Sequence, residues 1–73
     1  MEVRIGMQSV PRELVVETGM SQEEIKAALA AAVAADGGIF ALPDEKGGEV
    51  LVQASKIAYV EVGGQDSRRI GFR

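Results

Sequence analysis

The sequence predicts a single small α+β domain spanning residues 1–73, a two-layer sandwich in which one helix packs on a mostly antiparallel sheet. Three observations predict this class. Apolar and polar residues alternate at the start of the chain, a helical period with a capping motif follows over residues 21–37, and strand-like patterns return after it. The predicted order is β-β-α-β-β-β, with a further edge strand over residues 68–73.

The first two strands are predicted over residues 2–8 and 13–18. In the first segment Val3, Ile5 and Met7 alternate with mostly polar residues, which is typical of a strand with one buried face. A proline lies between the segments and suits a turn, because it has no N–H to donate to a central ladder. Two strands this close in sequence favour an antiparallel hairpin.

The helix is predicted to begin after Ser21 and to stop at Gly37. Ser21 and Glu24 have the spacing of a capping box, in which each side chain accepts a hydrogen bond from the other residue's backbone N–H. Met20 and Ile25 flank the cap as a hydrophobic staple. The 3.6-residue period predicts one buried stripe, made of Ile25, Ala28, Leu29, Ala32 and Val33.

The rest of the chain reads as strands separated by turns. The expected elements are strands over residues 39–42, 49–54 and 57–62, turns over residues 43–48 and 63–67, and a brief break at residues 55–56. A pair of glycines marks each turn, because glycine supplies the positive φ that tight turns need. A final strand over residues 68–73 would add an edge to the sheet.

The composition argues against most kinds of enzyme. The chain has no cysteine, so it has neither a disulfide nor a thiolate metal site. It has no histidine, which removes the usual general base and the commonest transition-metal ligand. The sequence also lacks a glycine-rich phosphate motif and a nucleophile–base pair. We therefore predict a protein that is not an enzyme and that holds no cofactor or metal.

The charge pattern predicts a soluble cytoplasmic protein. Charged residues make up 26% of the chain and its net charge is −3, which is ordinary for a globular domain. This acidic balance disfavours general nucleic-acid binding, although it leaves room for a local basic patch. No apolar run approaches the length of a membrane span, and the first residues lack the features of a signal peptide.

Several segments resemble a family of very small actinobacterial proteins that is described as a domain of unknown function. They are Glu2-Val3-Arg4-Ile5-Gly6, Arg12-Glu13-Leu14-Val15-Val16-Glu17-Thr18, Leu42-Pro43-Asp44-Glu45-Lys46-Gly47 and Ser55-Lys56-Ile57-Ala58-Tyr59-Val60-Glu61-Val62-Gly63. The resemblance covers nearly the whole chain. It implies a cytoplasmic actinobacterial protein of the kind often labelled ATP-binding, and it transfers no catalytic residues.

A cluster of arginines near the end of the chain is a candidate anion-binding or nucleic-acid-binding strip. Arg68, Arg69 and Arg73 crowd this segment, and Arg4 joins them if the last strand lies beside the first. Arginine suits bidentate contacts with phosphate or carboxylate groups. Charged side chains on an edge strand also discourage aggregation, and we favour that interpretation.

The loop that begins at Gly63 is a candidate nucleotide site. Gly63, Gly64 and Ser67 precede two arginines, so loop amides and guanidinium groups could hold a phosphate. The spacing does not match a P-loop, because no Lys-Ser or Lys-Thr pair follows the glycines. A simple hairpin turn is the interpretation that we favour.

The outer face of the helix is a candidate protein interface. Ala27, Ala30, Ala31 and Ala34 lie there, where a free-standing surface helix normally carries charges. Such a surface would let another helix pack closely, either from a partner or from a second copy in a homodimer. Alanine is also the best helix former, and the sequence does not separate the two explanations.

The function predicted from these residues is that of a small adaptor or regulatory protein that binds a macromolecular partner, with a homodimer as one form. Nucleic-acid binding through the arginine strip and ATP binding at the Gly63 loop are the alternatives. Tyr59 and Glu61 share a strand face, which could serve proton transfer, but such a tyrosine is more often half-buried with its hydroxyl at the surface.

Overall fold

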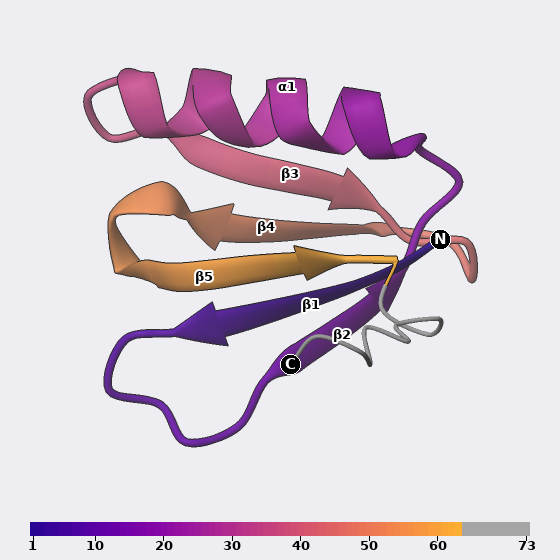
Figure 1. Cartoon of the computed structure of the whole chain (residues 1–73), viewed down its shortest axis with the longest axis horizontal. Helices are drawn as coiled ribbons and strands as arrows, with labels where there is room; N and C mark the ends of the chain where they lie inside the picture. The colour runs from indigo at the N-terminus through magenta and orange to yellow at the C-terminus, as the bar shows by residue number, and fades with distance from the viewer. Residues whose placement is uncertain (64–73) are drawn as a thin grey trace, which may run out of the picture.

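A computed structural model describes residues 1–63 of the chain. Its elements follow the predicted order (Figure 1). They are β1 (Glu2–Met7), β2 (Leu14–Glu17), α1 (Gln22–Ala34), β3 (Ile39–Pro43), β4 (Glu49–Gln53), the 3₁₀ turn η1 (Ala54–Lys56) and β5 (Ile57–Val62). The small α+β class is therefore confirmed, and the additional strand predicted over residues 68–73 lies outside the described residues.

The five strands form two antiparallel sheets. One has the order β2-β1-β5 and the other pairs β3 with β4. The predicted hairpin of the first two strands is confirmed, with Val3 opposite Val16. We expected a single sheet, but no ladder joins β4 to β5 in the described part of the chain. The chain passes between these strands through η1 instead of a tight hairpin turn, so they do not pair.

The helix begins as its capping motif predicts. The Glu24 backbone N–H donates to Ser21 Oγ at 3.1 Å, and the Ser21 N–H donates to Glu24 Oε1 at 2.9 Å. The helix ends at Ala34, slightly before the predicted stop, and Ala35 caps it with extended backbone angles. Gly37 follows in the left-handed region, with φ of 69°. That conformation turns the chain back toward β3.

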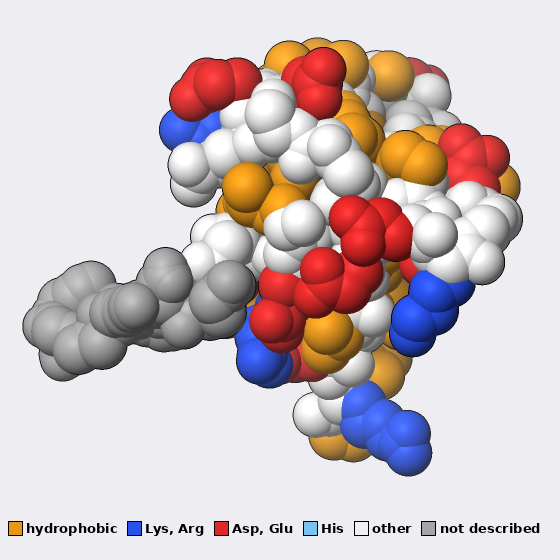
Figure 2. All heavy atoms as spheres, turned by 90° about the vertical axis from the view of Figure 1, so that its right-hand side faces the viewer, with side chains coloured by type: hydrophobic (Ala, Val, Ile, Leu, Met, Phe, Trp, Pro, Cys, Tyr) orange, Lys and Arg blue, Asp and Glu red, His pale blue; other side chains and the backbone are white. Residues whose placement is uncertain are grey.

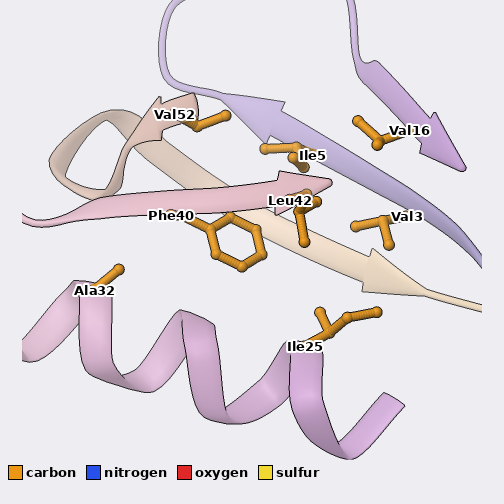
Figure 3. Packing of buried hydrophobic residues seen from close by; sticks show 8 residues of the cluster. All are labelled: Val3, Ile5, Val16, Ile25, Ala32, Phe40, Leu42 and Val52. Atoms are coloured by element: carbon orange, nitrogen blue, oxygen red, sulfur yellow. The ribbon is translucent and has the colours of Figure 1, made fainter. Parts of the chain in front are cut away.

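The core lies between α1 and the inner faces of both sheets (Figure 3). Its fully packed members are Val3, Ile5, Val16, Ile25, Ala32, Phe40, Leu42 and Val52. The predicted stripe holds for Ile25 and Ala32, which are buried, whereas Val33 is 65% exposed. The expectation that Val33 is buried was wrong. The helix packs chiefly on β3, with further contacts at η1, so only the centre of the stripe is covered and Val33 lies on its flank.

The turn between β3 and β4 is built by short-range hydrogen bonds. The Asp44 N–H donates to the Gly48 carbonyl at 3.1 Å, and the Lys46 N–H donates to Asp44 Oδ1 at 2.9 Å. Gly47 and Gly48 adopt φ values of 107° and 83°, which side chains disfavour. The helix of the described region is too short and insufficiently apolar to cross a membrane.

Candidate interaction surfaces

A polar cluster crosses the outer face of the three-stranded sheet, on the side away from the core. The Tyr59 hydroxyl donates a hydrogen bond to Glu13 Oε2. The Arg4 guanidinium donates to the other oxygen of the same carboxylate at 3.3 Å, and it forms an ion pair with Glu2 at 3.0 Å. The Glu13 carboxylate therefore joins a side chain of β1 to one of β5.

A glycine makes this arrangement possible. Gly6 lies opposite Tyr59 in the ladder of β1 with β5. A Cβ atom at Gly6 would lie 2.2 Å from Tyr59 Cε2, so the ring rests directly over the glycine backbone. The ring can thus cross β1 and reach Glu13, near the start of β2. The ladder register shifts between Gly6 and Met7, at this same position.

The cluster shifts the proton affinities of its members. The hydrogen bond from Tyr59, with help from Arg4, lowers the pKa of Glu13. The same bond raises the pKa of Tyr59, because ionisation of the phenol would place a second negative charge beside the carboxylate. The hydrogen bond to Glu13, with the charge of Glu2 next in effect, raises the pKa of Arg4. All three side chains keep their ordinary charge states at neutral pH.

The partner of Tyr59 was not found from the sequence. Tyr59 and Glu61 have same-face spacing on β5, but the hydroxyl bonds to Glu13, which is 46 residues away along the chain. Only the strand register places these two side chains together. The pairing of a glycine with an aromatic residue across two strands is the signal that could have suggested it.

The arginine strip is described only in part. Arg4 is paired with Glu2 and Glu13, and Glu61 lies opposite it in the ladder. Its charge is therefore already balanced by carboxylates of the same chain. The other predicted members, Arg68, Arg69 and Arg73, lie outside the described residues.

The candidate nucleotide loop is likewise described only at its first residue. Gly63 adopts a φ of 68°, and its N–H donates to the Glu2 carbonyl at 2.8 Å. This bond continues the ladder between β1 and β5 by one position. Gly64 and Ser67 lie outside the described residues.

The four alanines of the predicted interface are all exposed. They are Ala27, Ala30, Ala31 and Ala34, and we call them the alanine face. The buried helical residues Ile25 and Ala32 point toward the sheets, as Figure 3 shows. The exposed Val33 adds a branched apolar side chain on the flank of this face.

A second exposed apolar group lies on the outer face of the β3–β4 pair. Ile39 and Leu51 are exposed, the latter by 63%, and the half-buried Ala41 lies opposite Leu51. The continuous apolar run of residues 39–42 could have predicted this exposed group. Alternate side chains of a strand point to opposite faces, so an unbroken apolar run places apolar side chains on both faces. Within residues 1–63 there is no enclosed pocket and no acidic group arranged to hold a metal ion.

One known protein family matches the whole chain. Residues 1–73 match a family described as "Protein of unknown function (DUF3107)". The chain belongs to this DUF3107 family. No curated protein matches it. Membership of DUF3107 agrees with the resemblance seen in the sequence to a small domain of unknown function, and its description assigns no activity to the surfaces described above.

Proposed function

We propose that this DUF3107 protein is a small, non-catalytic adaptor or regulatory protein that binds a partner protein through the alanine face of α1. The observation that carries the proposal is the exposure of all four alanines, opposite the buried side of the helix. A helix of 13 residues is about 20 Å long, which is enough to support a helix-to-helix contact.

The chemistry of the alanine face suits an apolar helical partner. Small side chains allow a second helix to approach to about 8 Å between axes, the short end of the range for packed helices. Alanine also loses no rotamer freedom when it is buried, so each contact costs little side-chain entropy. The acidic residues of α1, Glu23 and Glu24, lie in its first turn and leave the rest of this face uncharged.

The partner in this proposal includes a second copy of the chain. A domain of this size buries only about 60% of the surface that its unfolded chain exposes. An interface between two copies would add buried apolar area and would stabilise the folded state by mass action. A homodimer through α1 is therefore one form of the proposed interaction.

We propose a cytoplasmic location and an actinobacterial source as parts of the same hypothesis, as the sequence resemblance implies. The nucleic-acid alternative depends on arginines outside the described residues. Residues 1–63 carry ten aspartates and glutamates against five lysines and arginines, a balance that disfavours a polyanionic ligand. The ATP alternative depends on the Gly63 loop, and adding ATP to the protein tests it directly.

The test compares three tagged proteins as bait in lysate of the host organism of the wild-type protein. They are the wild type, Ala30→Glu on the alanine face, and Gln22→Glu as a control that adds the same charge at the start of the helix. Each bait is used with and without nuclease, and circular dichroism checks that each is folded. Sedimentation of the purified proteins measures self-association.

A partner that survives nuclease and binds the wild type and Gln22→Glu, but not Ala30→Glu, supports the proposal. A dimer of the wild type that Ala30→Glu converts to a folded monomer supports its homodimer form. Partners that bind all three proteins equally contradict a role for the alanine face. Partners lost with nuclease favour the nucleic-acid alternative, and saturable ATP-induced changes near Gly63 favour the ATP alternative.

A further inference from the structure

The strand β2 forms one edge of the three-stranded sheet, and alternate backbone groups along it point away from β1. The Met1 amine donates to the Thr18 carbonyl at 2.8 Å, and the Thr18 N–H donates to the Met1 carbonyl at 3.0 Å. Hydrogen-bonded and non-bonded pairs alternate along an antiparallel ladder. Val16 therefore bonds to β1 as Thr18 does, whereas the backbone groups of Val15 and Glu17 point outward.

A contact from the β3–β4 turn agrees with this assignment. The Glu45 N–H donates to the outward carbonyl of Glu17 at 2.8 Å. The remaining outward groups are the N–H and carbonyl of Val15 and the N–H of Glu17. They have no backbone partner among residues 1–63. An added strand can therefore pair with both backbone groups of Val15, and at Glu17 with the N–H alone, because Glu45 already occupies that carbonyl.

Apolar side chains at this edge are exposed on both faces of the sheet. Leu14 is 42% exposed and points to the inner face, and Val15 is 55% exposed and points to the outer face. An extended segment paired with β2 would cover both side chains with its own alternating residues. A single extended segment would therefore gain both backbone hydrogen bonds and apolar burial at this edge.

Three carboxylates flank the edge, two of them beside a basic group. Glu13 precedes β2 and pairs with Arg4, Glu17 ends it and lies 3.7 Å from the Met1 amine, and the Glu45 backbone is bonded to its outer side. Figure 2 shows acidic side chains over the end of the molecule where the N-terminus and the β3–β4 turn lie, with Lys and Arg side chains at the margins of the same face. A bound segment that carries arginine or lysine would match this charge.

We propose that the open edge of β2 binds an extended, positively charged segment of a partner protein, which joins the sheet as a strand beside β2. This interaction uses a different surface from the alanine face, so either proposal can fail without the other. A second copy of β2 is disfavoured as the occupant. Antiparallel pairing about Val15 would bring Glu13 and Glu17 of the two copies opposite one another, and like charges in that position repel.

The test is a titration of the full-length, ¹⁵N-labelled protein with a capped Arg-Val-Arg-Val-Arg peptide, followed by NMR. We expect saturable shifts at the amides of residues 14–17 and slower hydrogen exchange at the Val15 and Glu17 amides. A capped Glu-Val-Glu-Val-Glu peptide is the charge control. A third peptide, identical to the first but N-methylated along its backbone, keeps the side chains and charge but cannot donate backbone hydrogen bonds.

Two variants test the edge itself. Val15→Pro removes an outward N–H without removing a bond to β1, and proline is tolerated at this kind of edge position. We expect it to weaken binding at least about tenfold, because it removes one of the two free donors and blocks close approach. Val15→Ala, which keeps the N–H, is the matched control and should bind within about threefold of the wild type. If Val15→Pro does not fold, Glu17→Gln replaces it. We expect this variant to lose less affinity for the peptide, and high salt should weaken binding to the wild type in the same way.

Several outcomes would overturn the proposal. They are equal binding of the acidic or N-methylated peptide, unchanged binding by Val15→Pro, or shifts that centre on another surface. Shifts at residues 14–17 that grow with protein concentration, without peptide, would assign the edge to a second copy. Tighter peptide binding by an Arg68→Glu/Arg69→Glu variant would assign it to the chain's own last residues. Either result contradicts a separate partner.

Discussion

Gly38 lies where α1 leads into β3, and the absence of its side chain leaves room for the helix backbone. A Cβ atom at Gly38 would lie 1.9 Å from the carbonyl oxygen of Ala32 and 2.8 Å from its carbonyl carbon. Both atoms belong to the backbone, so no side-chain rotation relieves the overlap. The Gly38 N–H donates to the Ala35 carbonyl at 3.1 Å, and the Gly38 carbonyl accepts from the Ala54 N–H at 3.0 Å. These bonds hold the residue in place on both sides.

Gly38→Ala is therefore expected to destabilise the protein strongly. The end of α1 must move until the distance of 1.9 Å reaches at least 3.0 Å, which separates α1 from β3. Overpacking of this kind typically costs about 1–3 kcal/mol, and we expect about 3 kcal/mol here because the obstacle is backbone. Small domains are stable by only about 5 kcal/mol, so more than half of the free energy of unfolding would be lost.

The neighbouring glycine supplies the matched control. Gly37 has a φ of 69°, and a Cβ atom there would meet nothing within 4 Å. Gly37→Ala should therefore cost only about 1 kcal/mol, the penalty of a left-handed conformation. Urea unfolding followed by far-UV circular dichroism measures both variants. With a slope near 1 kcal/mol/M, the midpoints should fall by about 3 M for Gly38→Ala and about 1 M for Gly37→Ala.

Equal midpoints for the two variants would refute this reasoning, because conformational strain alone would then account for both. A Gly38→Ala midpoint close to that of the wild type would show that α1 and β3 are not held at the distance described. An unfolded Gly38→Ala protein beside a folded Gly37→Ala protein would agree with the expected order of the two effects.

Three further predictions concern the cap, the core and the polar cluster. Ser21→Ala removes the capping box and should cost about 1 kcal/mol in urea unfolding. Ile25→Ala should cost about 2–5 kcal/mol, whereas Val33→Ala should stay within about 0.5 kcal/mol because that side chain is exposed. Because Tyr59 lowers the pKa of Glu13, the wild type should unfold at a higher urea concentration than Tyr59→Phe above pH 4.5. That difference should shrink as the pH falls from there through the lowered pKa, and a constant difference would contradict the assignment.

The local features of this fold could be predicted from the sequence because neighbouring residues determine them. Ser21 and Glu24 are one helical turn apart, so their reciprocal hydrogen bonds need nothing from the rest of the chain. The alternation around Val3 and Ile5 likewise identifies β1 and its buried face. The order of elements follows from such local signals, and the structure confirms it.

The tertiary features could not be predicted in the same way. The Tyr59 hydroxyl reaches Glu13 only because the ladder places the ring over Gly6, and no local pattern specifies that register. Val33 fits the helical period but lies beyond the narrow strip of α1 that β3 and η1 cover. Its exposure depends on which elements the helix packs against, which hydrophobic periodicity does not reveal.

The two proposed surfaces differ in position and in chemistry. In Figure 1 α1 lies at one end of the succession of strands and β2 at the other, so the alanine face and the β2 edge are separated by the body of the domain. The first would take an uncharged apolar helix, and the second an extended basic segment. Partners chosen by such different forces should not compete, and only the second should weaken with salt. If both partners bind at once, the domain can link them. If binding of one partner prevents binding of the other, the effect must pass through the core that both surfaces share.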